Sequence, residues 1–330
     1  MNYNPIRTGT QIRGNTSTYT VGREIAQCGS ARVFRGASLD AQKKEVVIKT
    51  PKFDGNSETN IRLLKREARI MKRTISKDGT KHPNIVELLD NGEHTNDKIP
   101  FLVLEDLGDN ELKKVIDNEG PLKPRTAIRI LKTVLETIHF LAKNGVFHKD
   151  IKPENLIYVP KRGPVLIDFG ISEHEEEEGL TEDPSQVFGT PLYMPIEIAN
   201  GGFPTIKSEV FSAAMCAAVI QSEQEEIKPR AVVMSREFFE ERKRKIREFL
   251  ERAPRETRIA LQSNLSEDSS QRQTAIQFAH SIERILNPGA QEMEYRRIKS
   301  DEKNVPGWVI ALGVSAGFGA LAAEIVEKLK

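Results

Sequence analysis

The chain has 330 residues, and its 49 basic and 48 acidic residues leave a net charge of +1. This length is enough for one two-lobed domain with tails. No block of Lys and Arg alternates with aromatic residues, which argues against nucleic acid as a main partner. With two cysteines and no secretion signal at the N-terminus, the main domain is expected in a reducing cytoplasm.

The first third of the sequence predicts a small antiparallel β-sheet with one helix. Residues 1–18 are rich in Thr, Asn and Gly with little apolar periodicity, which predicts a flexible segment. A small lobe is then expected over residues 19–107. Its helix, over residues 60–74, has apolar positions at Ile61, Leu64, Ala68 and Met71. Short β-branched runs predict its strands at 19–25, 32–36, 45–50, 85–91 and 101–105.

The pattern becomes mainly helical after residue 107. A larger lobe is expected over residues 108–286, with a short strand at 165–167. Its helices are predicted at 111–118, 124–144, 206–221, 235–251, 256–265 and 272–286. The predicted fold class is therefore α+β, with a small sheet lobe and a larger helical lobe.

The C-terminal region contains an apolar segment after a polar linker at residues 287–304. No charged residue occurs from Val305 to Ala323 within the C-terminal segment 305–330, and a helix of that length would measure about 28 Å, close to the thickness of a bilayer core. The basic residues before it would hold that side in the cytoplasm. Its glycines, Pro306 and the adjacent Glu324 fit equally well a helix docked on the large lobe. A membrane anchor and a docked helix both remain open.

The most informative motif is the run from His148 to Asn155, followed by Asp168-Phe169-Gly170. Asp150 is placed to accept or orient the proton of a hydroxyl group, and Lys152 can neutralise charge on a transferred phosphoryl group. Asn155 and Asp168 offer the hard oxygen ligands that Mg²⁺ prefers. Asp, Asn and Pro also favour turns, but a turn alone would not require the second motif.

These motifs resemble the eukaryotic-type serine/threonine protein kinase family over about residues 19–286. The resemblance implies the two-lobed kinase fold, ATP as substrate, Mg²⁺ as cofactor and a protein with Ser or Thr hydroxyls as the second partner. It implies that Lys49, in the run Val46 to Lys49, holds the ATP phosphates and that Glu67 orients Lys49. It places the rest of the nucleotide site at Ala26, Cys28, Gly29, Val33, Glu105 and Leu107.

A second group of residues resembles the peptide-docking loop of that family. It consists of Gly189-Thr190-Pro191 and the run from Tyr193 to Glu197. The resemblance implies a pair between Glu197 and Arg272, which would fix the floor of the peptide site if it is shielded from water. It also places Lys152 beside Thr190, a feature of the serine/threonine type.

Several positions depart from the family pattern. Ala26, Cys28 and Ala31 stand where three glycines are expected, which predicts weaker ATP binding. Cys28 is either a reactive thiol or an inert loop residue. Lys149 replaces an arginine, so a single mobile ammonium charge stands in place of a planar guanidinium group that can make two parallel hydrogen bonds. Glu209 replaces an aspartate, which puts its contact with the catalytic loop in doubt.

The segment after Asp168 is acidic and carries hydroxyl groups. Glu173 and the four glutamates at 175–178 either approach Lys149, and so partly substitute for a phosphate, or form a solvated loop. Thr181 and Ser185 are the expected sites of autophosphorylation.

Three functions compete. The leading one is a serine/threonine protein kinase, because the whole set of expected site residues is retained: Lys49, Glu67, Asp150, Lys152, Asn155 and Asp168. The second is a pseudokinase that binds or scaffolds partners with negligible turnover. The third is a kinase for small molecules, against which the peptide-docking motifs argue.

Overall fold

The structure is a computed structural model that describes residues 5–27, 29–94, 97–175, 188–230 and 234–288. The chain divides into two units, residues 1–282 and residues 283–330. The first unit contains both lobes and the candidate site.

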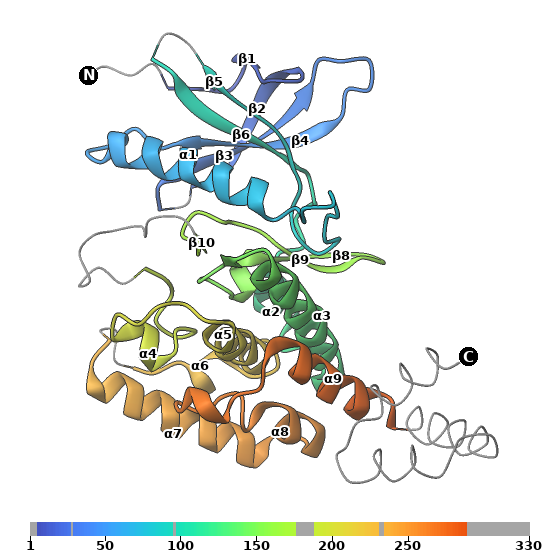
Figure 1. The fold of residues 1–330 in the computed structure, drawn as a ribbon, viewed down its shortest axis with the longest axis vertical. Coiled ribbons are helices and arrows are strands. Elements are labelled where there is room, and N and C mark those ends of the chain that lie inside the picture. Colours follow the sequence, from blue (N-terminus) through green and yellow to red (C-terminus); the bar gives the residue numbers. More distant parts are fainter. Residues whose placement is uncertain (1–4, 28, 95–96, 176–187, 231–233, 289–330) are drawn as a thin grey trace, which may run out of the picture. The chain divides into compact units, whose positions relative to one another are not determined.

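The small lobe is a six-stranded antiparallel sheet in the order β1-β2-β3-β4-β6-β5 (Figure 1). Alternate residues point to one face, where Phe34, Ile48 and Val103 form a core with no exposed surface. The helix α1 (Ser57–Arg73) packs on this sheet through Leu64 and Met71. The strands are β1 (Gln11–Arg13), β2 (Thr18–Gln27), β3 (Ala31–Ser38), β4 (Glu45–Pro51), β5 (Leu88–His94) and β6 (Ile99–Glu105).

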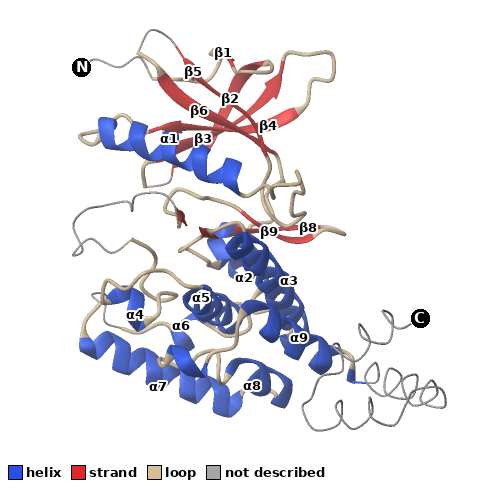
Figure 2. Cartoon of the chain, viewed as in Figure 1, coloured by secondary structure: helices blue, strands red, loops and turns tan. Residues whose placement is uncertain are grey.

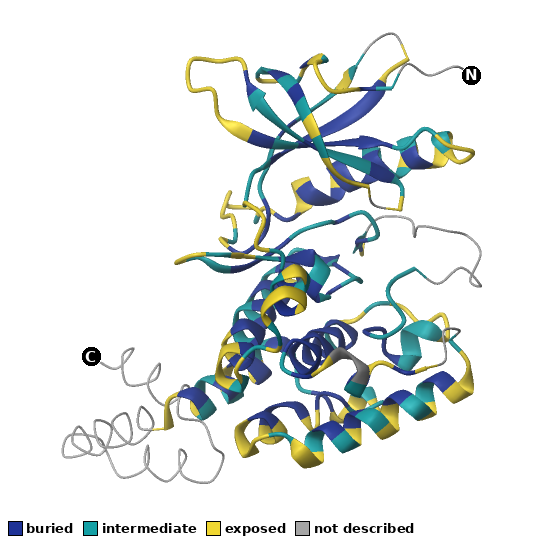
Figure 3. Cartoon of the chain, turned by 180° about the vertical axis from the view of Figure 1, so that it is seen from behind, coloured by how far each residue is buried: buried dark blue, intermediate teal, exposed yellow. Residues whose placement is uncertain are grey.

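The large lobe is mainly helical (Figure 2). Its central helix α5 begins with a reciprocal cap between Thr205 and Ser208 and is buried from Ser208 to Val219 (Figure 3). The described helices are α2 (Leu112–Glu119), α3 (Pro124–Lys143), α4 (Ile196–Ala199), α5 (Ile206–Val219), α6 (Gln224–Ile227), α7 (Arg236–Arg252), α8 (Arg255–Leu261) and α9 (Ala275–Leu286). Short strands β7 (Val146–Phe147), β8 (Leu156–Val159), β9 (Gly163–Leu166) and β10 (Glu173–His174) form two antiparallel pairs, β10 with β7 and β8 with β9.

The predicted α+β fold with two lobes is confirmed. Most predicted elements end within a few residues of the observed ones; α8 ends at Leu261 and not at residue 265, and a further difference is at α9. This helix begins at Ala275 and not at residue 272, because Arg272 has an extended backbone with φ −80° and ψ 142°. An extended Arg272 directs its guanidinium group into the lobe, as described below.

The predicted flexible segment at residues 1–18 is wrong for its described part. Strand β1 pairs with β2, and Ile6 and Ile12 are buried in the core of the sheet with 1% and 0% of their surface exposed. These two apolar residues are six positions apart among polar ones, so they produce neither a helical nor a strand period. Their burial nevertheless offsets the ordering entropy of the segment.

A single carboxylate holds the segment that joins β1 to β2. Asp90 of β5 accepts hydrogen bonds from the backbone amides of Asn15, Thr16 and Ser17 at 3.0, 3.0 and 3.2 Å. It also accepts from the hydroxyls of Thr16 and Tyr19 at 2.7 and 3.1 Å. Burial acts to raise the pKa of Asp90, but the hydrogen bonds from Thr16 outweigh it and lower that pKa.

We therefore expect Asp90→Asn to lower the free energy of unfolding by about 2 kcal/mol at pH 7, because an amide cannot accept all of these bonds. A carboxylate with a lowered pKa in the folded protein stabilises it above the unfolded pKa and loses this effect as the pH falls. The difference between variant and wild type should thus shrink below about pH 4. Urea unfolding at both pH values measures it, with the exposed Asp117→Asn as the control. Equal stability of Asp90→Asn and wild type at pH 7 would contradict this account.

Candidate active site

A cleft of about 740 Å³ lies between the two lobes, inside the first unit. Its apolar lining comes from both lobes and includes Ile25, Val33, Val47, Leu104, Ile157 and Ile167. All four residues predicted for catalysis and metal binding line the same cleft: Asp150, Lys152, Asn155 and Asp168. Residues from positions 25 to 190 thus meet in one place.

Three charged side chains meet in the cleft. Lys49 at the end of β4 places its Nζ 2.6 Å from Oε1 of Glu67 on α1 and 2.7 Å from Oδ1 of Asp168, which follows β9. Lys49 and Glu67 are only 5% and 3% exposed. A lysine held between two carboxylates has a fixed position, so its charge is directed into the cleft.

Mutual attraction controls the ionisation of this group. Burial alone would lower the pKa of Lys49, but Asp168 and Glu67 together raise it above its ordinary value. Lys49 lowers the pKa of Asp168 to about 2 against the opposing effect of burial. Burial raises the pKa of Glu67 in spite of Lys49. Asp168 is therefore ionised at neutral pH and available to a cation.

The backbone at Asp168 is in the left-handed region, with φ +63°. This conformation is unfavourable for a residue with a side chain. It is held by the bond of Oδ1 to Lys49 and by a hydrogen bond from the amide of Gly170 at 3.2 Å. A Cβ atom at Gly170 would lie 3.1 Å from that same oxygen, so a glycine at this position leaves room for the carboxylate.

Asp150, Lys152 and Thr190 form a closed triangle. The Nζ of Lys152 lies 2.6 Å from Oδ2 of Asp150 and donates to the hydroxyl of Thr190 at 2.8 Å. That hydroxyl donates to Oδ1 of Asp150 at 2.7 Å. The predicted proximity of Lys152 and Thr190 is thus present in the structure. A small hydroxyl group already occupies the position next to the carboxylate where an acceptor hydroxyl would be oriented.

Asn155 lies in a short 3₁₀ turn, Pro153–Asn155, that directly follows Lys152. Its Nδ2 donates to the backbone oxygen and to Oδ2 of Asp150 at 2.7 and 2.9 Å. The amide group is thereby oriented, and its carbonyl oxygen remains the atom suited to a metal. Together with Asp168 this provides two hard oxygens, the number that Mg²⁺ usually takes from a protein when phosphates and water complete its shell.

Glu209 of α5 holds the start of the loop that carries Asp150. Its two carboxylate oxygens accept the backbone amides of His148 and Lys149, both at 2.9 Å. Lys149 has φ +70°, so this contact supports a second left-handed residue. Burial raises the pKa of Glu209 to about 7, while the two amides oppose the rise. The doubt about this contact is removed, since the longer side chain still reaches the loop.

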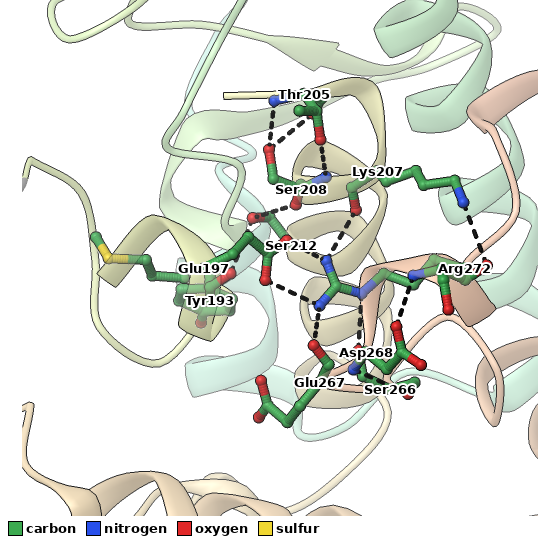
Figure 4. A network of polar contacts seen from close by, with 12 residues as sticks. Tyr193, Glu197, Thr205, Lys207, Ser208, Ser212, Ser266, Glu267, Asp268 and Arg272 are labelled. Carbon is green, nitrogen blue, oxygen red and sulfur yellow. Dashed lines mark hydrogen bonds and ion pairs between the residues drawn. The ribbon is translucent and has the colours of Figure 1, made fainter. Parts of the chain in front are cut away.

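Glu197 and Arg272 form the predicted pair. The guanidinium group of Arg272 binds both carboxylate oxygens of Glu197, at 2.5 and 3.1 Å. It also donates to the backbone oxygens of Ser266, Lys207 and Glu267 (Figure 4). The Arg272 side chain has no exposed surface, so this is a shielded bidentate pair of the kind that fixes a loop.

Comparison with known proteins shows to which family the chain belongs. A model of the protein kinase domain matches residues 19–282. The chain belongs to the protein kinase family. Members of this family use ATP as phosphoryl donor and Mg²⁺ as cofactor, which agrees with the sequence prediction.

The curated relatives are bacterial kinases. Serine/threonine-protein kinase PrkC of Bacillus subtilis is 33% identical over 205 residues, which make up 62% of this chain and 30% of that protein. The probable serine/threonine-protein kinase PknB of Lactococcus lactis is 30% identical over 196 residues, 59% of this chain and 30% of that protein. Serine/threonine-protein kinase PknB of Mycobacterium tuberculosis is 30% identical over 134 residues, which make up 40% of this chain and 21% of that protein. The matched region spans less than a third of each relative.

The nucleotide side of the cleft differs from the predicted set in detail. Ala26, Gly29 and Val33 line the cleft, as do Glu105 and Leu107. The carboxylate of Glu105, however, binds Arg162 at 2.8 and 2.9 Å. Only the backbone of Glu105 therefore remains for a nucleotide. Cys28 lies outside the described residues.

The acidic segment contacts Lys149 through its first glutamate. The Nζ of Lys149 lies 2.5 Å from Oε1 of Glu173, and both side chains are mostly shielded, at 11% and 19% exposed. Glu173 also belongs to β10, which pairs with β7 just before Lys149. Residues 176–178 and the predicted phosphorylation sites Thr181 and Ser185 lie outside the described residues.

Two kinds of residue in and around the cleft were not recognised from the sequence. The apolar cleft walls, such as Val47, Leu104 and Ile157, were not recognised because such residues look the same in any core. Arg66 and Arg242, which are 6% and 0% exposed, were not singled out from the sequence. A usable signal existed for Arg242, since it occupies a position of the apolar stripe of α7 with Phe238 and Ile246.

The apolar segment from Val305 to Ala323 also lies outside the described residues. Among the helices that the structure describes, none has both the length and the apolar character needed to cross a bilayer.

Proposed function

We propose that this chain transfers the γ-phosphoryl group of ATP to Ser or Thr hydroxyls of proteins. The observation that carries the proposal is the assembled site. Lys49 is bound by Glu67 and Asp168, and Asp150 is bound by Lys152 and Thr190, all in one cleft. The relatives PrkC and PknB, which are named serine/threonine-protein kinases, support the choice of hydroxyl acceptor.

Each residue of the site has a physical task in this reaction. Lys49 holds the phosphates, because its ammonium group is fixed by two carboxylates. Asp150 orients the acceptor hydroxyl and takes its proton, and Lys152 balances negative charge beside it. Asp168 and Asn155 would hold Mg²⁺. When bound, this ion neutralises charge on the phosphates.

The peptide-docking residues favour a protein acceptor over a small molecule. Thr190 is hydrogen-bonded to Asp150, and Glu197 is fixed by Arg272 a few residues further along the same loop. A shaped loop beside the reacting aspartate is useful for an extended polypeptide and unnecessary for a metabolite. A pseudokinase is disfavoured, because such a protein would not need all of these contacts.

Transfer of labelled phosphate from ATP to casein in the presence of Mg²⁺ tests the proposed function. Wild type is expected to label casein, and Asp168→Ala is expected not to. Equal labelling by both proteins would show that the activity does not come from this site. Absence of labelling by wild type would favour the pseudokinase.

We also propose that Glu173 lowers the requirement for a phosphate on the activation segment. The support is its contact with Lys149 at 2.5 Å, which joins the start of that segment to the residue before Asp150. Glu173→Gln should therefore lower kcat of the unphosphorylated protein by about tenfold, the effect of losing one shielded charged bond.

The matched control for Glu173 is the Lys149→Met and Glu173→Gln double variant. It should be no slower than the slower single variant, because both changes remove the same contact. Rates are measured after phosphatase treatment. An unchanged rate in Glu173→Gln would contradict the idea. It would also be contradicted if the effects of the two single substitutions on the activation free energy simply added in the double variant.

Two statements about location remain predictions from the sequence. The kinase domain is proposed to work in the cytoplasm, and the segment from Val305 to Ala323 is proposed either to attach it to a membrane or to dock on the large lobe. Release from the membrane fraction on deletion of residues 305–330 would support the first alternative for that segment. Full-length protein that stays soluble without detergent would support the second.

A further inference from the structure

One arginine occupies a core position in the large lobe. Arg242 lies in the middle of α7 and has no exposed surface. The residues one turn away on the same face are Phe238 and Ile246, both buried. An arginine on an apolar stripe loses its hydration, so its charge and its donors need partners inside the protein. Both Nη atoms of Arg242 have such partners, whereas its Nε has none among the described residues.

The donors of Arg242 are directed at the backbone of the peptide-docking loop. Its Nη1 lies 3.2 Å from the carbonyl oxygen of Pro191, 3.4 Å from that of Leu192 and 2.5 Å from that of Met194. The intervening carbonyl, of Tyr193, accepts from the hydroxyl of Ser212 on α5 at 2.8 Å. Four successive carbonyl groups therefore point into the lobe and are bound there.

The peptide-docking loop begins in contact with Asp150, the aspartate proposed to orient the acceptor hydroxyl. Thr190 directly precedes the four residues whose carbonyls are bound and donates to Asp150 at 2.7 Å. With the carbonyls held on the inner side, the loop has little freedom to shift relative to Asp150. A lysine could not replace Arg242 here, because its single nitrogen cannot bind the loop carbonyls and also reach Oε1 of Glu267, which accepts from the second nitrogen, Nη2.

The charge of Arg242 is balanced by a buried group that includes Arg272. Both guanidinium groups lie against the ring of Phe211, at 4.9 Å for Arg242 and 4.8 Å for Arg272. Glu267 joins them: its Oε1 accepts from Arg242 at 2.8 Å, and its backbone oxygen accepts from Arg272 at 3.1 Å. Figure 4 shows Glu267 beside Arg272 and Glu197 in this network. Two arginines and the two carboxylates of Glu197 and Glu267 leave no net charge.

We infer that Arg242 is a positioning residue for the protein substrate, an inference that rests on the proposed kinase function. It fixes the backbone of residues 191–194 and so sets the affinity of the docking loop for a polypeptide. Arg272 holds the far end of the loop through Glu197, and Arg242 holds the part next to Asp150. Arg242 does not line the cleft in which ATP is proposed to bind, so it should act on the protein substrate and not on ATP.

The experiment compares Arg242→Lys and Arg242→Met with wild type in the full chain. Hydrogen exchange of peptides covering residues 188–198 measures the freedom of the loop, and steady-state rates give KM for casein and KM for ATP. We expect faster exchange confined to this loop, and KM for casein raised about tenfold or more while KM for ATP stays within about twofold. The effect should be larger in Arg242→Met than in Arg242→Lys. Arg244→Lys is the control, since Arg244 lies on the same helix with 55% of its side chain exposed.

Two results would overturn the inference. One is unchanged exchange of residues 188–198 in both variants. The other is faster exchange throughout the large lobe with equal changes in both KM values, which would indicate a purely structural role. The exchange measurement does not need phosphoryl transfer. If wild type labels no protein, the proposed function fails, and loop exchange alone decides whether Arg242 fixes the loop.

Discussion

Replacement of Asp150 by asparagine is expected to lower kcat by about 100- to 10,000-fold. An amide of the same shape cannot take the proton of the acceptor hydroxyl. It also loses the ion pair with Lys152, whose Nζ lies 2.6 Å from Oδ2. The remaining contacts with Thr190 and Asn155 should keep the loop in place. KM for ATP should therefore change less than about threefold.

Steady-state rates with casein and a separate nucleotide-binding titration measure the two effects of Asp150→Asn. Asp78→Asn is the control, because Asp78 is an exposed aspartate in a surface turn of the small lobe. A kcat close to that of wild type would remove Asp150 from the reaction. A large loss of nucleotide affinity would indicate that Asp150 mainly holds the cleft together.

Lys49→Met is expected to have two large effects. The first is a loss of kcat/KM of about 100-fold or more, because the phosphates lose their fixed cation. The second is a loss of about 3 kcal/mol of unfolding free energy at pH 7, because Glu67 and Asp168 remain in the cleft without the charge between them.

The pH dependence separates this mechanism from simple loss of packing. In wild type, Lys49 lowers the pKa of Asp168 to about 2, so this carboxylate stabilises the fold at neutral pH and loses that effect only in strong acid. Without Lys49, the pKa values of Asp168 and Glu67 should both rise. Carboxyl groups with raised pKa values favour the folded state below their unfolded pKa, and they lose this effect as the pH rises. The variant should therefore be closest to wild type near pH 4 and furthest from it at pH 7.

Urea unfolding at several pH values tests this expectation. Lys65→Met is a matched control, since Lys65 pairs with Glu93 at 2.6 Å on the surface. Adding Glu67→Gln to Lys49→Met should recover part of the stability and none of the activity, because it removes one of the two unpaired charges. A loss of stability that does not vary with pH would mean that the methylene packing of Lys49, and not its charge, supports the cleft.

The sequence by itself determined the family, the main elements and most of the polar residues that the structure brings together in the cleft. The motif from His148 to Asn155 and the motif at Asp168 could be identified because their residues are close together in the chain. Helix α1 could be predicted because a period of 3.6 is a local property of the sequence, and Glu67 could be assigned from the resemblance to the kinase family. These features depend on neighbouring residues, and neighbouring residues are what a sequence shows directly.

Only the tertiary structure decided which residues hold distant segments of the chain in position. Asp90 meets Thr16 across 74 positions, Glu209 meets His148 across 61, and Arg242 meets Met194 across 48. In sequence each of them is one charged residue among many, and a charge gives no sign of a partner so far away. Burial makes such a contact strong, because a charge removed from water requires its partner. Burial depends on how distant segments pack, and for this reason the structure was needed to find these residues.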